Sequence, residues 1–379
     1  MFLIYVIGVA SIQIIEKIQG GSFSKLFMIA FLLTLASSLL KRRVIKKKWG
    51  RIYLCTGAIV VSYYVWFQFI RYERIQFSSR AALINILLCP FLIANLNFAN
   101  FRWKKIEKLI FLYIVSNIFL FHIRYPGFLT RGNAGILQYK GASSDANLLG
   151  AIFFSFLILE FWGVTRISIV NRLLSMYLIV LNGSRNFTVC GIVVLLTDII
   201  LFYRVRRWSF AKLLVRIALV GILIYPLADY MGLLDQFVVR RFASQGLDSN
   251  GRAYMVFAFQ QVVLKQATFQ ELLFGGPPLA ERYWAIAGLT RGHSFAENSY
   301  ISMLMLFGAV GCFLIFYYVV LCVRMGKGKN RAYYVVLASV LVAFISHDTI
   351  LYIQGFVGLT GALAVLATDG RQSQFLSTA

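Results

Sequence analysis

Acidic residues are scarce in this sequence, which has 14 Asp and Glu residues against 38 Lys and Arg and a formal net charge of +24. A strongly basic balance is typical of nucleic-acid-binding proteins. Most of the basic residues, however, stand in short clusters between apolar runs. The positive-inside bias of membrane proteins predicts this pattern, so we expect no nucleic-acid partner.

Motifs for bound nucleotides and metal ions are lacking as well. The sequence has no Walker-type phosphate loop, no His-Glu-x-x-His zinc motif and no Asp-x-Asp pair of the kind that metal-dependent membrane glycosyltransferases carry. The five cysteines fall in or beside apolar runs without metal-ligand spacing. They predict small buried side chains and no disulfide framework. We therefore expect neither a metal ion nor another cofactor.

Apolar residues dominate what is present. Hydrophobic residues make up 60% of the chain and aromatic residues 16%, with a mean hydropathy of +0.76, whereas a soluble domain is about 45–50% apolar. Apolar runs of about 17–25 residues, the length that spans a bilayer as a helix, recur along the chain. Short runs of strict alternation, which would indicate strands, are missing. The sequence predicts an all-α polytopic integral membrane protein with about 12 transmembrane helices.

The candidate spans and the basic clusters together predict a topology. With both termini on the cytoplasmic side, the short cytoplasmic connections hold most of the 38 Lys and Arg residues. This orientation places the loops Ile123–Ser144 and Met231–Asn298 outside the cytoplasm. The candidate spans are Phe2–Ile15, Ser24–Leu40, Ile52–Ile70, Ala81–Phe98, Leu109–His122, Asp145–Trp162, Leu173–Asn182, Asn186–Tyr203, Leu213–Tyr230, Ser299–Val323, Tyr333–Gln354 and Phe356–Thr368.

The chain divides into four segments on this topology. Residues 1–144 hold the N-terminal spans and the first outer loop, residues 145–230 hold further spans with Asp-x-Asn and Gly-Ser-Arg motifs, and residues 299–379 hold the C-terminal spans. Residues 231–298 form a loop far longer than ordinary connections, and such loops are usually functional. In it we expect a helix that begins at Ser249 or Asn250, lies along the membrane surface and is broken by "FGGPPL".

Arg185 is the most unusual residue of the apolar runs. An arginine at the middle of a lipid-embedded helix is unfavourable by roughly 2.5–3.5 kcal/mol on insertion scales. The preceding Asn182, Gly183 and Ser184 signal a break, so we expect Arg185 at an outer turn between two spans. There Arg185, beside Ser184, offers bidentate donors to phosphate oxygens of an anionic lipid headgroup. An interfacial arginine that snorkels to ordinary headgroups is the alternative.

Other polar residues are predicted on the same side of the membrane. A histidine or glutamate just before a span can act as a general base, which makes His293 and Glu297 candidates. The alternatives are plain structural roles, such as helix caps and solvated loop ends. The remaining candidates for binding are Asp145 and Asn147 at the start of the sixth span, Arg124 and Arg131 in the first outer loop, and Arg240, Arg252, Arg291 and Asn298 in the second.

Taken in order, five segments resemble the bacterial O-antigen polymerase and O-antigen ligase superfamily. They are "SSDANLLG", "LNGSRNFTVCGIVVLL", "SNGRAYMVFAFQQVVL", "ELLFGGPPL" and "ENSYISMLMLFGAVG", and together they cover about Ser144 to Gly311. The sequence departs from the family pattern at Ala146, where proline is usual. It departs again at Glu297, where ligases carry the histidine thought to act as base, with His293 one helical turn earlier. This departure favours a polymerase over a ligase.

The resemblance implies metal-independent, inverting glycosyl transfer at the periplasmic face of the bacterial inner membrane. The donor would be a glycan on undecaprenyl pyrophosphate, and the acceptor would be the non-reducing end of another lipid-linked repeat unit. Arg185 and Arg252, with Arg291 next, would hold the pyrophosphate, and His293 or Glu297 would be the base. Asp145 and Asn147 would orient an arginine or a sugar. Arg-x10-Gly patterns of some polymerases also match at Arg240 and Arg124.

Several alternatives to a polymerase of O-antigen stay open on the sequence. An O-antigen ligase would use the same donor with a lipid A–core acceptor, and a capsule or exopolysaccharide polymerase would differ in its sugars. A membrane transporter is the alternative of a different class, because embedded charges suit one as well. A chain-length regulator, a flippase and the surrounding membrane lipids are the partners that the resemblance implies.

Overall fold

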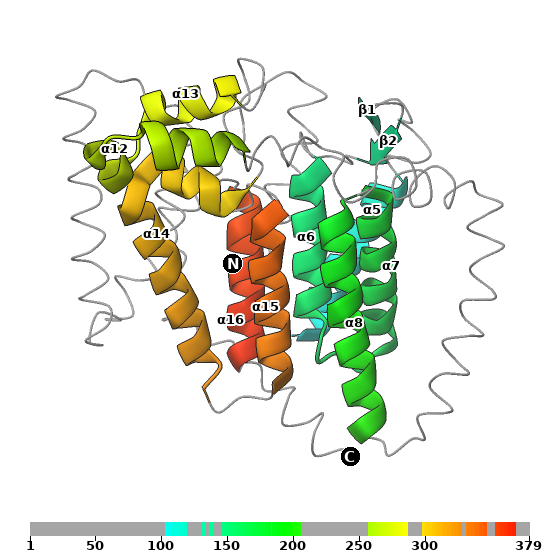
Figure 1. Cartoon of the computed structure of the whole chain (residues 1–379). Helices are drawn as coiled ribbons and strands as arrows, with labels where there is room; N and C mark the ends of the chain where they lie inside the picture. The colour runs from blue at the N-terminus through cyan, green and yellow to red at the C-terminus, as the bar shows by residue number, and fades with distance from the viewer. Residues whose placement is uncertain are drawn as a thin grey trace, which may run out of the picture.

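The structure is a computed structural model and describes residues 103–119, 130–133, 136–139, 146–182, 184–205, 257–286, 298–327, 331–346 and 353–368. Helices make up nearly all of this part, which confirms the predicted helical class (Figure 1). The helices that form the bundle are α5 (Trp103–Ile118), α6 (Ala146–Leu159), α7 (Arg166–Asn182), α8 (Arg185–Val205), α14 (Ser299–Met325), α15 (Arg331–Ser346) and α16 (Ile353–Thr368).

Two of the bundle helices begin earlier than predicted, because each takes up basic residues that the sequence analysis assigned to a cytoplasmic connection. Helix α5 starts at Trp103 and not at Leu109, and α7 starts at Arg166 and not at Leu173. In α5 the lysines lie exposed while the intervening residues, among them Ile106, are buried. One helix can therefore carry a charged face and a buried face through the same turn.

The remaining predicted boundaries agree within a few residues, except between the last two helices. There α15 ends at Ser346 and α16 begins at Ile353, so Gln354 belongs to the later helix. Five predicted spans lie outside the described residues, so their existence stays a prediction: Phe2–Ile15, Ser24–Leu40, Ile52–Ile70, Ala81–Phe98 and Leu213–Tyr230.

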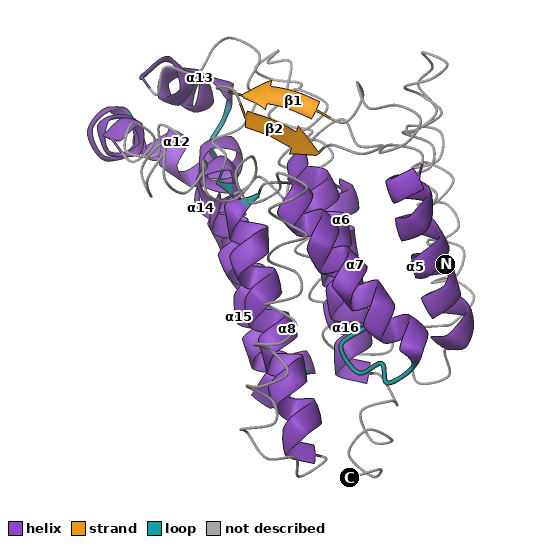
Figure 2. Ribbon diagram, turned by 90° about the vertical axis from the view of Figure 1, so that its right-hand side faces the viewer, coloured by secondary structure: helices purple, strands orange, loops and turns teal. Residues whose placement is uncertain are grey.

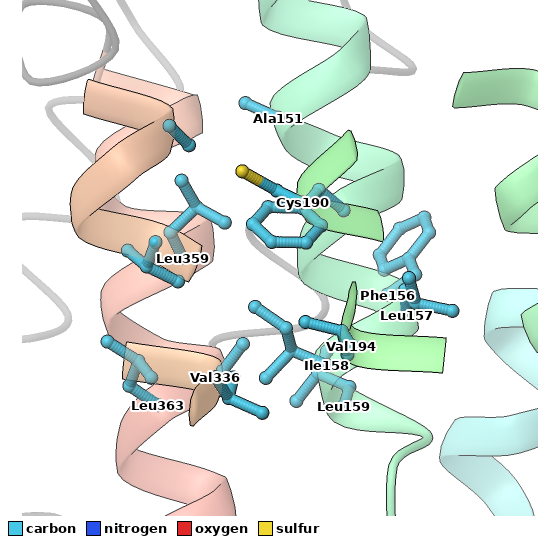
Figure 3. Close-up of a cluster of buried hydrophobic side chains, with 14 of the residues drawn as sticks. Ala151, Phe156, Leu157, Ile158, Leu159, Cys190, Val194, Val336, Leu359 and Leu363 are labelled. Carbon is cyan, nitrogen blue, oxygen red and sulfur yellow. The ribbon is translucent and has the colours of Figure 1, made fainter. Parts of the chain in front are cut away.

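The core of the bundle lies where α6 and α8 face α16 and α15. Helix α6 packs on α7 and α16, and α8 packs on α15. The packed side chains are almost all apolar; those labelled in Figure 3 include Ile158 of α6, Val194 of α8, Val336 of α15 and Leu363 of α16. Gly358 lets α16 approach α6 closely, since a Cβ on it would lie 2.8 Å from the Ser155 hydroxyl oxygen. Small residues at such crossings are typical of helix packing in membranes.

The outer faces of the bundle are apolar too. Leu112 of α5, Leu173 of α7, Val189 of α8 and Phe316 of α14 are each more than half exposed. Among the described residues, α14 is the helix that is both long and apolar enough to cross a membrane, and parts of α6, α8, α15 and α16 are apolar but shorter. Exposed apolar surface of this extent is typical of proteins that contact a membrane or a partner.

A separate helical layer lies across one end of α14 (Figure 1). It consists of the π-helix η5 (Gln260–Gln266), α12 (Phe269–Phe274) and α13 (Pro277–Ile286). Its own small core joins Val262 of η5 and Tyr283 of α13 to Met305 of α14. The expected break at "FGGPPL" is confirmed, because α12 stops at Phe274 and α13 starts at Pro277. The helix expected before it is not continuous, since extended residues Ala267 and Thr268 separate η5 from α12. The expected starting residues of the loop helix, Ser249 and Asn250, lie outside the described residues.

A short hairpin interrupts the otherwise helical structure. Strands β1 (Thr130–Asn133) and β2 (Ile136–Tyr139) pair antiparallel, with Arg131 opposite Gln138 and Asn133 opposite Ile136. The hairpin lies in the first outer loop, for which the sequence analysis predicted no strand. A four-residue strand is too short for alternation to be read from the sequence, so hydropathy gave no signal. Figure 2 shows it beyond the ends of α6 and α7.

Candidate functional site

The predicted turn at Gly-Ser-Arg is confirmed. Helix α7 ends at Asn182 and α8 begins at Arg185, so the two helices form an antiparallel pair across this break. Ser184 is buried, and its carbonyl oxygen accepts hydrogen bonds from the Thr188 backbone N–H and from the Thr188 hydroxyl, both at 2.9 Å. Arg185 therefore occupies the first position of α8, where helix N–H groups and the dipole favour an anion.

The start of α6 lies against the same turn. Asn147 falls in the first turn of α6, and Asp145 lies just outside the described residues. One turn further, a Cβ on Gly150 would lie 2.9 Å from both the Asn182 side-chain oxygen and the ring of Phe187. Only glycine permits this approach. The first turns of α6 and α8, which carry Asn147 and Arg185, thus come to one end of the bundle.

Asn298 caps the helix that follows the long loop. Its side-chain oxygen accepts hydrogen bonds from the backbone N–H groups of Tyr300 at 3.0 Å and Ile301 at 3.1 Å, which is the geometry of a helix N-cap. Asn298 thus has a structural role as a helix cap, whereas the alternative that the sequence suggested for its segment was a solvated loop end. Its role in substrate binding stays a prediction.

Helix α15 connects the Gly-Ser-Arg turn with the start of α14. The Asn186 side-chain amide donates a hydrogen bond to the Val342 carbonyl oxygen at 3.0 Å. The Tyr300 hydroxyl donates one to the carbonyl oxygen of the neighbouring Leu341 at 2.9 Å. Arg185 precedes the donor Asn186, and Asn298 lies two residues before the donor Tyr300. The backbones of Arg185 and Asn298 therefore both lie near the same turn of α15. The sequence analysis missed both donors, because neither belongs to a charged or catalytic type.

The β-hairpin lies at this end of the bundle as well. Strand β2 contacts α7, and both views place the hairpin on the side of the starts of α6 and α8 (Figures 1 and 2). Arg131 of β1 is thus carried to the end where Arg185 and Asn147 lie. We call this the hairpin end of the bundle, defined by β1, β2 and the first residues of α6, α8 and α14.

The η5–α12–α13 layer is fixed to α14 by facing glycines. Gly275 and Gly308 have φ values of +68° and +58°, which favour glycine. A Cβ on Gly275 would lie 2.5 Å from the Phe307 backbone nitrogen, and one on Gly308 would lie 2.5 Å from the Leu273 carbonyl oxygen. The Gly276 N–H also donates to the Met305 carbonyl at 2.9 Å. The backbone at the end of α12 thus packs directly against the backbone of α14 at its bend, Gly308.

A capping box and an ion pair stabilise this layer from within. The Thr268 hydroxyl accepts from the Glu271 N–H at 3.3 Å, and the Glu271 carboxylate accepts from the Thr268 N–H at 2.8 Å. Arg282 of α13 pairs with the same carboxylate. Burial raises the pKa of Glu271, but these hydrogen bonds and the Arg282 charge outweigh it and bring the pKa below its ordinary value. The Thr-x-x-Glu spacing is a sequence signal for this cap that the sequence analysis did not use.

A second polar cluster lies at the opposite end of the bundle, and the sequence analysis missed it. Asn171 of α7 donates to the Glu160 carboxylate at 2.8 Å and to the Glu107 backbone carbonyl at 2.9 Å. Arg172 pairs with Asp198 of α8 and donates to the Gly163 carbonyl at 2.8 Å. All five side chains are at least nine-tenths buried. We call this the turn end, defined by these residues and the α6–α7 connection.

The turn-end cluster could be predicted only in part from the sequence. Ionisable residues inside apolar runs are rare and by default important. Glu107 is preceded by lysines, however, and Glu160 is the last residue before an aromatic pair, so each looks like a residue of a solvated helix end. Only the packing of α5, α7 and α8 shows that they are buried together. Among the described residues, no group of three or more His, Cys, Asp or Glu side chains is arranged to hold a metal ion.

The remaining predicted site residues lie outside the described residues: Arg124, Arg240, Arg252, Arg291, His293 and Glu297. For Arg131, Asn147 and Arg185 the structure describes the backbone position. The structure places the backbone of Asn147, Arg185 and Asn298 at one end of the bundle, and their role in one site stays a prediction. A role in that site also stays a prediction for the arginines of the long loop and for the base.

Comparison with known proteins identified no related family or curated protein. The all-helical class is thus supported by the structure, and the resemblance to a family is supported by the sequence motifs alone.

Proposed function

We propose that this protein is a surface-polysaccharide polymerase of the O-antigen type in the bacterial inner membrane. It transfers a growing glycan from undecaprenyl pyrophosphate to the non-reducing end of a lipid-linked repeat unit, on the periplasmic face. The observation that carries the proposal is the bridge across α15. It joins the Gly-Ser-Arg turn to the start of α14, two segments about 115 residues apart that the family pattern assigns to one site.

The membrane setting is supported by the outer surface of the bundle. Helix α14 is long and apolar enough to span a bilayer, and large apolar side chains point outward from α5, α7, α8, α14 and α15. Water would leave these side chains unfavourably hydrated, whereas lipid tails would cover them. The polar groups at the two ends of the bundle then fall near the two membrane surfaces.

The reaction needs charge stabilisation and one proton transfer. The acceptor hydroxyl oxygen attacks the anomeric carbon of the donor, and the bond from that carbon to the pyrophosphate oxygen breaks. Negative charge develops on the leaving undecaprenyl pyrophosphate, where Arg185 at the start of α8 and Arg252 and Arg291 from the long loop stabilise it. His293 or Glu297 takes the hydroxyl proton. The products are the lengthened lipid-linked glycan and free undecaprenyl pyrophosphate.

Arg131, Arg124 and Arg240 extend the same positive surface toward the incoming substrates. Their positive charge would attract a phosphate-bearing substrate. Asp145 and Asn147 at the start of α6 orient a sugar or an arginine. A ligase or a capsule polymerase would use this arrangement with another acceptor. Identifying the acceptor would therefore distinguish these alternatives.

Membrane transport is the competing function, and the turn-end cluster is the observation that favours it. Buried ionisable residues within a helix bundle often mark ion or substrate pathways. A transporter should move a labelled substrate into proteoliposomes without forming a new covalent bond. A polymerase should instead lengthen a lipid-linked repeat unit in the same vesicles.

Deletion of the gene followed by electrophoresis of the surface polysaccharide separates the enzymatic candidates. Loss of a polymerase leaves core carrying a single repeat unit, whereas loss of a ligase leaves bare core and polymer on the carrier lipid. An unchanged ladder of chain lengths would rule out both. Purified protein with lipid-linked repeat units, without added nucleotide or divalent metal, should form polymer, and a strict need for either additive would contradict the proposed chemistry.

A further inference from the structure

We infer that Asn186 and Tyr300 are positioning residues, which set the distance between the phosphate-binding and acceptor-side halves of the site by holding adjacent carbonyls of α15. The inference rests on the proposed function. It assigns a role to two side chains that were not among the site residues predicted from the sequence, and neither would touch the reacting atoms. The bridge itself can be tested without any assumption about the reaction.

The first contact fixes α8 to α15. Asn186 directly follows Arg185, and its amide nitrogen lies 3.0 Å from the Val342 carbonyl oxygen. The amide oxygen of Asn186 lies 3.7 Å from the Cys190 sulfur one turn further along α8. The amide group is thus held at both of its ends, so its orientation and that of the first turn of α8 are determined together.

The second contact fixes α14 to α15. Tyr300 lies two residues after Asn298, in the turn whose N–H groups the Asn298 side chain caps. Its hydroxyl reaches Leu341 across 41 residues of sequence, and the Tyr300 side chain is partly buried at the helix contact. A carbonyl of a regular helix keeps a free lone pair for such an additional donor.

The two acceptors are consecutive residues of one rigid helix. Leu341 and Val342 are followed by Ala343 and Phe344, which are fully buried in the bundle core. Helix α15 therefore cannot slide or rotate on its own to satisfy one donor and release the other. The start of α8 and the start of α14 are therefore each fixed relative to α15. Their separation is set in this way without a hydrogen bond between α8 and α14.

A fixed separation of the two helix starts matters because the proposed reaction needs two groups in place at the same time. The leaving pyrophosphate must be held by the Arg185 side while the acceptor hydroxyl is deprotonated on the side of the segment before Asn298. Ground-state binding of the donor needs only one of these halves. Misplacement by about 1 Å can cost up to about a hundredfold in rate, so loss of the bridge should lower kcat and leave KM nearly unchanged.

Steady-state kinetics of the full-length protein in liposomes, with lipid-linked repeat units as substrate, test this role. We expect Asn186→Ala and Tyr300→Phe each to lower kcat about tenfold with KM within about twofold. The double variant should lose little more than either single one, because both act through the same turn. Thr197→Val and Tyr334→Phe are matched controls: Thr197 bonds only within α8, to Val193, and Tyr334 is exposed on α15. Unchanged kcat in both bridge variants would overturn the inference.

Distance measurements provide a readout that does not depend on activity. Spin labels at Val189 on α8 and Ala309 on α14, both exposed, report the separation of the two helices in a background that keeps the buried Cys190 and Cys322 and lacks the other three native cysteines. The Asn186→Ala/Tyr300→Phe variant should shift or broaden the distance distribution, and an unchanged distribution would overturn the inference. If the wild-type protein forms no polymer while the distribution shifts, the proposed function fails and the bridge stands.

Discussion

The two ends of the bundle differ in what their polar side chains bond to. At the turn end, Asn171 and Arg172 bond to the carboxylates of Glu160 and Asp198 as well as to backbone carbonyls. At the hairpin end, side chains bond to backbone: Asn186 to α15, Tyr300 to α15 and Asn298 to the first turn of α14. At the turn end, the positive charge of Arg172 is paired with the negative charge of Asp198 within the bundle. The contacts at the hairpin end order the helix starts with neutral groups.

This difference indicates a division of labour between stability and function. Buried charged pairs cost much free energy when one partner is lost, whereas a neutral side-chain contact to a backbone carbonyl in a membrane contributes about 0.6–2 kcal/mol. Substitutions at the turn end should therefore change folding first, and substitutions at the hairpin end should change activity first. Four substitutions test this contrast.

The largest expected effect is at the turn end. Arg172→Leu leaves Asp198 buried without its partner, so the free energy of unfolding should fall by about 3–5 kcal/mol. Arg172→Leu/Asp198→Leu should regain much of this loss, because neither partner of the pair then leaves the other buried as an uncompensated charge. Denaturant unfolding in detergent measures both, with Arg331→Leu at an exposed site as the control. Equal losses in the single and double variants would contradict the account of the pair.

Arg185 should behave in the opposite way, with a large effect on activity and a small one on stability. Removal of one preorganised charge-stabilising group typically lowers a rate about 10²–10³-fold, so Arg185→Ala should abolish long polysaccharide chains at normal protein levels. Arg185→Lys keeps the charge but not the bidentate geometry and should give an intermediate rate. Full-length polymer from Arg185→Ala on a polysaccharide gel would remove Arg185 from the proposed site.

Gly308 tests whether the η5–α12–α13 layer belongs to the hairpin end as one body. Alanine there combines a strained backbone with a clash against Leu273, a combined cost of about 1–3 kcal/mol. We expect Gly308→Ala to loosen the layer and to accelerate proteolysis within residues 257–286. Ala309→Gly, on the exposed side of the same turn, controls for helix propensity, which costs about 1 kcal/mol. Equal cleavage rates in the two variants would argue against the glycine contact.

The smallest expected effect is on the pH dependence of the same layer. The folded structure lowers the pKa of Glu271 below its ordinary value of 4.5. Its contribution is therefore complete above that value and is lost as pH falls through the lower, folded pKa. Since the pair is partly solvated, we expect less than about 1 kcal/mol. Proteolysis of residues 257–286 should accelerate below about pH 4.5 in the wild type and show no such acid-dependent step in Glu271→Gln, with exposed Glu281→Gln as the control.

The helical class and several breaks between helices were predictable because they depend on local composition. An apolar run predicts a buried or lipid-covered helix wherever it occurs. Gly-Ser before Arg185 and Gly-Gly before Pro277 predict breaks, because glycine and proline disrupt helices in any context. The starts of α5 and α7 were missed, because lysine and arginine are compatible with a helix as well as with a loop. Hydropathy alone does not distinguish the two.

The turn-end cluster and the bridge across α15 had no such local signal. Glu107 and Asn171 are 64 residues apart, and Asn186 and Val342 are 156 residues apart. Each side chain is ordinary for its own helix, and its role depends on which face of which neighbour it meets. The polar groups predicted from the sequence belong to one end of the bundle, and the structure shows a buried polar cluster at the other end.

The sequence by itself determined that this chain forms apolar helices, where glycine and proline interrupt them, and that basic residues stand between them. These properties follow from the transfer of side chains out of water and from the backbone freedom of single residues, both of which are local. Only the tertiary structure decided which polar residues are tied to each other and which helix starts share α15. Hydrogen bonds need donor and acceptor within about 3 Å, and for residues far apart in sequence only the packing of whole helices brings them to that distance.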